Sequence, residues 1–174
     1  MKKGLQFFSI LLIFSACQST SIVRIETPYG AIRFAFHKEC KRHKARFLAL
    51  VRAGYWDSLS FNRVVPNFVI QGGCPDTDAG FSGSPHLEEA ELFPQLKHVY
   101  GAVGAGRDDN PEKRSAVCQF YIVQNPLGLA RLDGKYTVFG QVIEGMQVVD
   151  SIARMPRDKN DQPLVRIPIR VKEE

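Results

Sequence analysis

The sequence contains few cysteines and no apolar run long enough to cross a bilayer. Its four cysteines, spread over 174 residues, are too few and too unevenly spaced for a disulfide scaffold or a paired CxxC zinc site. The apolar stretch at residues 5–14 is about half as long as a membrane-spanning helix must be. The chain also has no internal repeat and no low-complexity tract. These absences exclude a disulfide scaffold, a collagen-like repeat and a polytopic membrane protein.

The charged residues are nearly balanced in sign. There are 23 Lys and Arg against 18 Asp and Glu, which gives a formal net charge of +5, and 44% of the residues are hydrophobic. The densest basic cluster, residues 38–46, is typical of the solvated face of a helix, so no nucleic-acid partner is expected. A chain of this length is sufficient for one domain with a core of its own.

The first 17 residues have the layout of a bacterial export signal. A positively charged start precedes the apolar run, and small residues follow it. Ser15-Ala16-Cys17 is similar to a lipobox, in which the cysteine is acylated and becomes the new N-terminus. The sequence therefore predicts a lipid anchor on Cys17, a short tether over residues 18–21 and a folded domain over residues 22–174. The alternative is a plain signal peptide, residues 1–17, with an incidental cysteine.

Such a signal predicts a location in the cell envelope, facing the periplasm or the exterior, with the protein secreted if the lipobox is not used. Disulfides form in these compartments. After acylation of Cys17, the three remaining cysteines are Cys40, Cys74 and Cys118. Because their number is odd, at least one thiol stays unpaired or pairs between chains. The sequence leaves the pairing open.

The spacing of apolar residues predicts eight strands and two helices. The strands are expected over residues 22–27, 32–36, 60–65, 69–71, 98–105, 118–124, 136–143 and 165–172, and the helices over 39–53 and 146–153. Because strands do not alternate with helices, the pattern favours a mainly β fold, a closed eight-stranded antiparallel barrel capped by two α-helices. Two long connections, 72–97 and 106–117, are expected to be binding loops.

The segment around Arg63 carries the most informative local pattern. A three-residue hairpin loop at 66–68 would pair Val65 with Val69 and place Arg63 opposite Gln71 on one sheet face. A two-residue turn would give the guanidinium an apolar partner instead. A guanidinium within an otherwise apolar hairpin needs polar partners. The pattern therefore predicts a groove with one fixed cation, amide side chains and an aromatic pocket.

Signatures of metal and cofactor chemistry are incomplete. Asp76 begins a stretch like a calcium loop, but Gly80 stands at a ligand position. The four histidines lack the His-Glu-x-x-His spacing. Gly104 and Gly106 lack the context of a dinucleotide site, and together with Gly101 they are expected to let another backbone approach closely. No metal and no cofactor is therefore expected.

Three segments together resemble the cyclophilin family of peptidyl-prolyl cis-trans isomerases. They are residues 61–73 (FNRVVPNFVIQGG), 119–122 (QFYI) and 132–140 (LDGKYTVFG). The resemblance covers about residues 22–171, and the family's eight-stranded barrel with two capping helices agrees with the predicted strands. It implies an enzyme without a cofactor that accelerates X–Pro isomerisation in folding or exported proteins of the cell envelope.

The resemblance also implies roles for individual residues. Arg63 would be the catalytic arginine, and Gln71 the glutamine that orients it and binds the substrate backbone. The substrate-binding residues would be Phe68, Val69, Gly106, Arg107, Gln119, Tyr121, Leu132 and Tyr136. Arg131 stands at the position of a tryptophan that binds cyclosporin in some members of the family.

Proline-containing polypeptides are the expected partners, together with the membrane through Cys17, and the chain is expected to be a monomer. The alternative is a non-catalytic chaperone that binds proline peptides in the same groove and differs from the enzyme only in turnover. A β-barrel carrier of small apolar ligands is a third hypothesis. It conflicts with the presence of the Arg63 guanidinium in its pocket.

Overall fold

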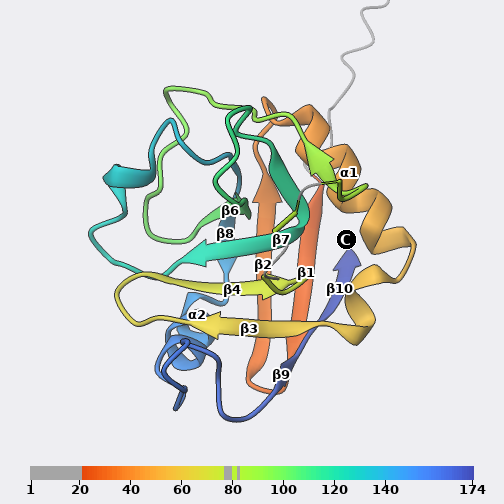
Figure 1. Cartoon of the computed structure of the whole chain (residues 1–174). Helices are drawn as coiled ribbons and strands as arrows, with labels where there is room; N and C mark the ends of the chain where they lie inside the picture. The colour runs from red at the N-terminus through yellow and green to blue at the C-terminus, as the bar shows by residue number, and fades with distance from the viewer. Residues whose placement is uncertain (1–20, 77–79, 82) are drawn as a thin grey trace, which may run out of the picture.

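The computed structural model describes residues 21–76, 80–81 and 83–174 (Figure 1). The predicted export signal, Cys17 and the tether up to residue 20 lie outside the described residues. None of the described helices is long and apolar enough to cross a membrane.

A single antiparallel sheet of ten strands forms the framework of the fold. The strands are β1 (Ile22–Thr27), β2 (Gly30–Phe36), β3 (Ser60–Val64), β4 (Val69–Gly73), β5 (Leu87–Glu88), β6 (Ala102–Gly106), β7 (Ser115–Val123), β8 (Val138–Glu144), β9 (Ile167–Pro168) and β10 (Arg170–Glu173). Neighbouring strands follow the order β10-β1-β2-β8-β6-β7-β4-β3-β9, and β5 pairs with β7 outside this path.

The C-terminal segment closes the sheet into a barrel. β10 pairs with β1 at one end of the strand order and β9 pairs with β3 at the other, yet only Ile169 separates β9 from β10. Figure 1 shows this segment running from beneath β3 to the side of β1. Counting β9 and β10 as one bent strand, and leaving out the two-residue β5, gives the eight-stranded barrel predicted from the sequence. The mainly β fold class is therefore confirmed.

Aromatic side chains fill the interior beneath α1 (Lys41–Arg52). Phe47 of α1 stacks on Trp56, with ring centroids 4.8 Å apart, and meets Phe34 and Phe120 edge-on. None of these four rings is exposed to solvent. Because buried aromatic rings contribute a large apolar area and prefer such offset or edge-on contacts, they fix α1 over its side of the barrel.

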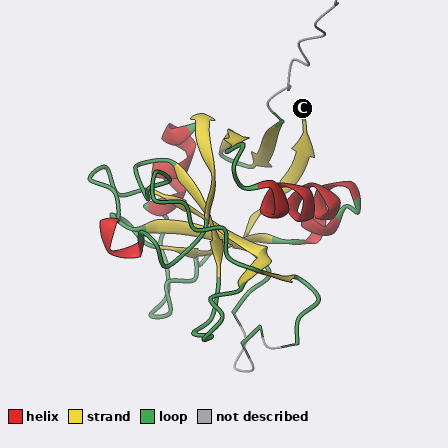
Figure 2. Cartoon of the chain, turned by 90° about the horizontal axis from the view of Figure 1, so that it is seen from above, coloured by secondary structure: helices red, strands yellow, loops and turns green. Residues whose placement is uncertain are grey.

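The two α-helices cap the barrel, as the sequence predicts. α2 (Met146–Ala153) has the predicted bounds and buries Val148, Val149 and Ile152. Gly54 ends the first helix in the left-handed region, with φ of 66°, and donates its N–H to the carbonyl of Val51. Seen from above, helices lie on two opposite sides of the strands (Figure 2). The groove described below is formed by strands, loops and the short 3₁₀ helix η2 (Ala130–Leu132).

Several predicted element bounds were wrong. β6 begins at Ala102 rather than at residue 98, because the chain turns at Gly101, whose φ is 79°. β8 begins at Val138 rather than 136, because the N–H of Tyr136 turns back to the carbonyl of Leu132. The connection 72–97 is not wholly irregular, since β5 pairs with the start of β7 there. Turns set the first two bounds, and pairing between distant segments sets the third. The period of the apolar residues shows neither.

Candidate functional site

The β3–β4 hairpin has the register that the sequence predicts. Arg63 lies opposite Gln71, and the N–H of Val65 donates to the carbonyl of Val69 at 2.9 Å. Asn67 takes the left-handed conformation, with φ of 57°, which Asn tolerates well. The predicted three-residue loop is thus confirmed. The ladder is irregular at Asn62, so Arg63 follows a local distortion of its strand.

A groove of about 220 Å³ lies beside this hairpin. It is lined by the ten residues predicted for catalysis and substrate binding, namely Arg63, Phe68, Val69, Gln71, Gly106, Arg107, Gln119, Tyr121, Leu132 and Tyr136, together with Asp76 and Arg131. The tertiary structure therefore brings all of the predicted site residues of the domain together. Cys17, the predicted lipidation site, lies outside the described residues.

The apolar part of the groove is a pocket walled by aromatic and aliphatic side chains. Val69 and Tyr121 are buried, and Phe68, Leu132 and Tyr136 pack against them. The rings of Tyr121 and Tyr136 meet edge-on, with centroids 6.3 Å apart. A pocket with these walls suits a small, rigid apolar ring such as that of proline.

A histidine fixes Tyr121 in the wall of the pocket. The buried side chain of His98 lies 2.8 Å from Asp133 through Nδ1 and 2.8 Å from the Tyr121 hydroxyl through Nε2. Burial lowers the pKa of His98, so its ring is neutral and Nε2 accepts the phenolic proton. Burial also raises the pKa of Tyr121 well above its ordinary value. Sequence reasoning missed His98, because the residues that hold it are distant in the chain.

The glycines of β6 leave room for side chains of the groove. A Cβ atom on Gly104 would collide with the ring of Tyr121, and one on Gly106 would collide with the Gln119 amide. The sequence predicted that these glycines let another backbone approach. That interpretation was wrong for both, since side chains of β7 occupy the space.

The guanidinium of Arg63 lies at the edge of the pocket. Its side chain is 36% exposed, its Cζ lies 5.7 Å from the centroid of the Phe68 ring, and Nη2 donates to Oδ2 of Asp161 at 3.2 Å. Arg157 binds the other oxygen of the same carboxylate at 3.3 Å. Nothing in the sequence pattern pointed to Asp161.

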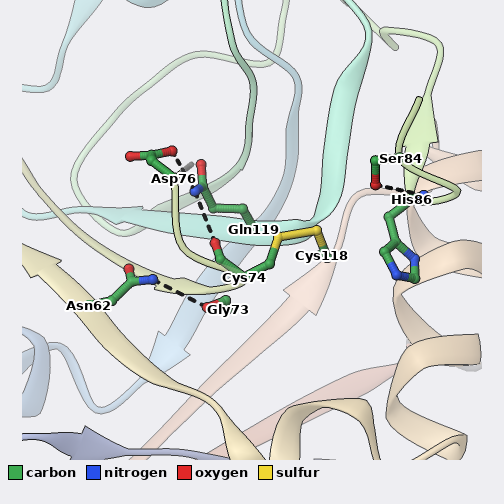
Figure 3. The surroundings of a disulfide bond; sticks show 8 residues. All are labelled: Asn62, Gly73, Cys74, Asp76, Ser84, His86, Cys118 and Gln119. Atoms are coloured by element: carbon green, nitrogen blue, oxygen red, sulfur yellow. Dashed lines mark hydrogen bonds between the residues drawn. A yellow bond between two sulfur atoms is a disulfide. The ribbon is translucent and has the colours of Figure 1, made fainter. Parts of the chain in front are cut away.

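Asp76 bridges the two amide side chains of the groove. Its Oδ1 accepts a hydrogen bond from Nε2 of Gln119 at 2.9 Å, and its Oδ2 accepts one from Nε2 of Gln71 at 3.4 Å. Figure 3 shows Asp76 beside Gln119, whose amide also donates to the carbonyl of Cys74 at 3.0 Å. From the sequence, Asp76 was interpreted only as the start of a stretch like a calcium loop. Its role in orienting the amides was missed.

A disulfide between Cys74 and Cys118 holds the segment that carries Asp76. The Cα atoms of the two cysteines lie 5.4 Å apart, and the bond joins the end of β4 to β7 (Figure 3). Cys40 is free and buried, and burial raises the pKa of its thiol to about 12. The pairing that the sequence left open is thus Cys74 with Cys118, and both partners are neighbours of groove residues.

Two further arginines cover aromatic walls of the pocket. The Cζ atom of Arg131 lies 4.7 Å from the centroid of Phe68, and that of Arg107 lies 4.8 Å from the centroid of Tyr136. Among residues 21–76, 80–81 and 83–174, no cluster of three or more His, Cys, Asp or Glu side chains could hold a metal ion. The groove therefore combines an apolar pocket, hydrogen-bonding amides and guanidinium groups.

Comparison with known proteins agrees with this geometry. The family described as cyclophilin type peptidyl-prolyl cis-trans isomerase/CLD matches residues 22–173. The peptidyl-prolyl cis-trans isomerase-like 1 of Neurospora crassa is 35% identical over 155 residues, covering 84% of this chain and 90% of the relative. A peptidyl-prolyl cis-trans isomerase of Acinetobacter baylyi is 33% identical over 150 residues, covering 84% and 79%.

Solved structures are also similar to this chain in fold. A crystal structure of a cyclophilin type peptidyl-prolyl cis-trans isomerase from Cryptosporidium parvum superposes with a TM-score of 0.76 at 27% identity, covering 89% of this chain and 98% of that chain. A second crystal structure of that protein, in the presence of the dipeptide Ala-Pro, has a TM-score of 0.75. The family match covers nearly all of the described residues, and the fold agrees with it. The chain therefore belongs to the cyclophilin-type peptidyl-prolyl cis-trans isomerases.

Proposed function

We propose that this isomerase acts on X–Pro bonds of folding or exported proteins in the cell envelope, with Arg63 as its catalytic residue. The observation that carries the assignment of Arg63 is its place at the edge of the pocket, with its guanidinium beside the Phe68 ring. To Gln71, directly opposite on β4, we assign the binding of the substrate backbone. The hydrogen-bond partner that holds Arg63 is Asp161 and not Gln71, whose amide donates to Asp76 instead.

The chemistry of the reaction explains why a guanidinium suits it. X–Pro isomerisation takes tens to hundreds of seconds without a catalyst, because rotation breaks the amide resonance. In the twisted transition state the proline nitrogen regains a localised lone pair and becomes a better hydrogen-bond acceptor. A guanidinium held against that nitrogen binds the twisted form more tightly than either planar form. Each tenfold gain in rate needs about 1.4 kcal/mol of such preference.

The pocket contributes by fixing the proline ring and excluding water. Apolar surface is supplied by Phe68, Tyr121, Leu132 and Tyr136 and by the buried Val69. In a site with little water, the electrostatic effect of Arg63 on the nitrogen is stronger. The relative from Cryptosporidium parvum was crystallised in the presence of Ala-Pro, a ligand of the kind that we assign to this pocket.

Two observations support a location in the cell envelope. Residues 1–17 have the layout of an export signal that ends in a lipobox-like cysteine. In the folded domain, Cys74 and Cys118 form a disulfide, a bond typical of oxidising compartments. We therefore propose a lipid anchor on Cys17, with the domain facing the periplasm or the exterior. Labelling of the full chain with a fatty acid should succeed for the parent and fail for Cys17→Ser.

The second candidate function is a chaperone that binds proline peptides without turnover. The observation that favours it is the ion pair with Asp161, which already engages Nη2 of the Arg63 guanidinium. The two functions differ in one measurement, because both bind a proline peptide but only the isomerase accelerates its exchange. The groove supports the isomerase better, since Arg63 remains partly exposed beside the pocket.

Exchange NMR on the domain with an acetylated Ala-Ala-Pro-Ala peptide tests the proposal. The parent domain should accelerate cis–trans exchange, and Arg63→Ala should lose most of that acceleration while keeping the fold. Arg170→Ala, a change on β10 outside the groove, is the matched control and should keep the parent rate. Binding of the peptide without acceleration by the parent would contradict the isomerase and support the chaperone.

A further inference from the structure

Among the residues that the structure describes, two of the three arginines that line the groove have no carboxylate partner. In the described part of the chain, no carboxylate oxygen lies within 4.0 Å of the guanidinium nitrogens of Arg107 or Arg131, whereas Arg63 pairs with Asp161. Arg107 donates to the backbone carbonyls of Lys135 at 3.2 Å and Asp108 at 2.8 Å. Both guanidinium groups lie over aromatic rings that form the wall of the proline pocket.

The carboxylates around the groove are already engaged by other groups. Asp161 forms ion pairs with Arg63 and Arg157, and Asp76 accepts hydrogen bonds from the two groove amides. Asp133 forms ion pairs with His98 and Lys97. Asp108 accepts hydrogen bonds from the backbone N–H of Phe81 and from the Asn110 amide. Among the described residues, none of these carboxylates forms an ion pair within 4.0 Å with Arg107 or Arg131, although the charge of Arg107 still helps to lower the pKa of Asp108. The rim of the pocket therefore carries two positive charges that no described carboxylate neutralises by contact.

We propose that these arginines give the enzyme a preference for substrates with an acidic residue next to the proline. The inference rests on the proposed function, in which the proline ring occupies the pocket between Phe68 and Tyr136. A ring held there brings the side chains of its two neighbours to the rim, where Arg131 and Arg107 lie. A carboxylate on either neighbour can then pair with a guanidinium that is positioned in advance by its aromatic contact.

The expected size of the preference follows from the exposure of the rim. Arg131 is exposed and Arg107 half-buried, so each ion pair with a substrate carboxylate is worth about a twofold to fivefold change in affinity. The effect should shrink as salt screens the pair. A lysine in place of the acidic residue should be disfavoured, because like charges repel at the same rim.

The experiment uses acetylated, amidated peptides Ala-X-Pro-Z-Ala, in which X or Z is Glu, Gln or Lys and the other position is Ala. Exchange NMR gives kcat/KM, and chemical-shift titration gives the dissociation constant. At roughly 20 mM salt, kcat/KM should fall in the order Glu, Gln, Lys in at least one of the two series, and the order should weaken near 0.5 M. Arg107→Gln and Arg131→Gln should each reduce the Glu-to-Lys ratio, and the double variant should bring it close to one.

Arg170→Gln is the matched control, because it removes one positive charge from β10 outside the groove. Its Glu-to-Lys ratio should equal that of the parent. Equal rates with Glu, Gln and Lys in both series, or a ratio that survives in the double variant, would overturn the inference. Failure to accelerate even the Gln peptides would contradict the proposed function instead, and the order of the dissociation constants would then decide the charge preference by itself.

Discussion

The carboxylate of Asp161 accepts a hydrogen bond of 3.2 Å from the guanidinium of Arg63, although the two residues are 98 positions apart in the chain. Asp161 is itself tied to the hairpin, because its carbonyl accepts the N–H of Val64 at 2.9 Å. The loop before β9 thus reaches across to β3 and holds the proposed catalytic side chain at the edge of its pocket.

Replacing Asp161 by Asn should lower kcat/KM for a proline peptide about twofold to fivefold, since a partly exposed ion pair contributes only modestly. The Asn amide keeps the shape of the side chain and one acceptor oxygen but carries no charge, so it holds the Arg63 guanidinium less firmly. Because Arg63 is proposed to act in the transition state, the decrease should appear mainly in kcat. Exchange NMR at several peptide concentrations separates kcat from KM. Arg157→Gln, which removes the other partner of Asp161, should have the smaller effect. A parent-like kcat for Asp161→Asn would contradict a positioning role.

Replacing Arg63 by Lys should reduce kcat/KM at least about tenfold, although the charge is kept. A lysine ammonium is a point charge on a flexible stem and cannot reproduce the planar fork that faces both Asp161 and the substrate nitrogen. The same exchange measurement applies, with circular dichroism to verify folding. Arg157→Lys serves as the matched control. Near-normal turnover by the Arg63→Lys variant would show that a general positive charge suffices.

Stability should decrease as the pH falls below about 6.5, the ordinary pKa of a histidine. Burial lowers the pKa of His43 in spite of its contact with Glu91 at 2.7 Å, and burial lowers the pKa of His98 in the same direction. The unfolded chain then binds more protons than the folded one, so acid favours unfolding. Urea titrations between pH 5 and 8 should show this slope. For His43→Asn, the free energy of unfolding should depend less steeply on pH. An unchanged pH dependence would contradict the contribution of His43 to acid unfolding.

Loss of the disulfide should reduce the free energy of unfolding by up to about 4 kcal/mol, because the bond closes a loop between cysteines 44 positions apart. The double variant Cys74→Ser, Cys118→Ser should unfold at lower denaturant concentration than the parent. A reductant should lower the unfolding midpoint of the parent to that of this variant and leave the midpoint of the variant unchanged. Equal midpoints for the oxidised and reduced parent would show that the bond contributes nothing to stability.

Gly104→Ala should damage the pocket directly. The added methyl group would collide with the ring of Tyr121, and relieving such overpacking costs about 1–3 kcal/mol. We expect lower stability and a higher KM for proline peptides, measured by urea unfolding and exchange NMR. Gly134→Asn is the control, because no described atom beyond the two neighbouring residues lies within 4 Å of a Cβ there and Asn tolerates its φ of 68°. A parent-like KM for Gly104→Ala would mean that Tyr121 moves without affecting the pocket.

The hairpin shows how much local sequence can determine. Turn chemistry at residues 66–68 and the period of two along the flanking strands fix which side chains face each other, so the pair of Arg63 and Gln71 could be predicted. Periodicity likewise gave α2 its bounds and gave the barrel its eight main strands. These features depend on interactions between residues close in the chain. The resemblance to the cyclophilin motifs predicted which residues line the groove.

Only the tertiary structure decided the contacts that tune the groove. Asp161 contacts Arg63 from a distant loop, and His98 holds the Tyr121 hydroxyl from the turn before β6. Cys118 forms its disulfide with Cys74 rather than with Cys40. Each of these contacts depends on how the sheet closes into a barrel, and several pairings would suit the same local pattern. The amino-acid sequence by itself determined the strands and the chemistry that they carry, whereas barrel closure decided which of those groups meet.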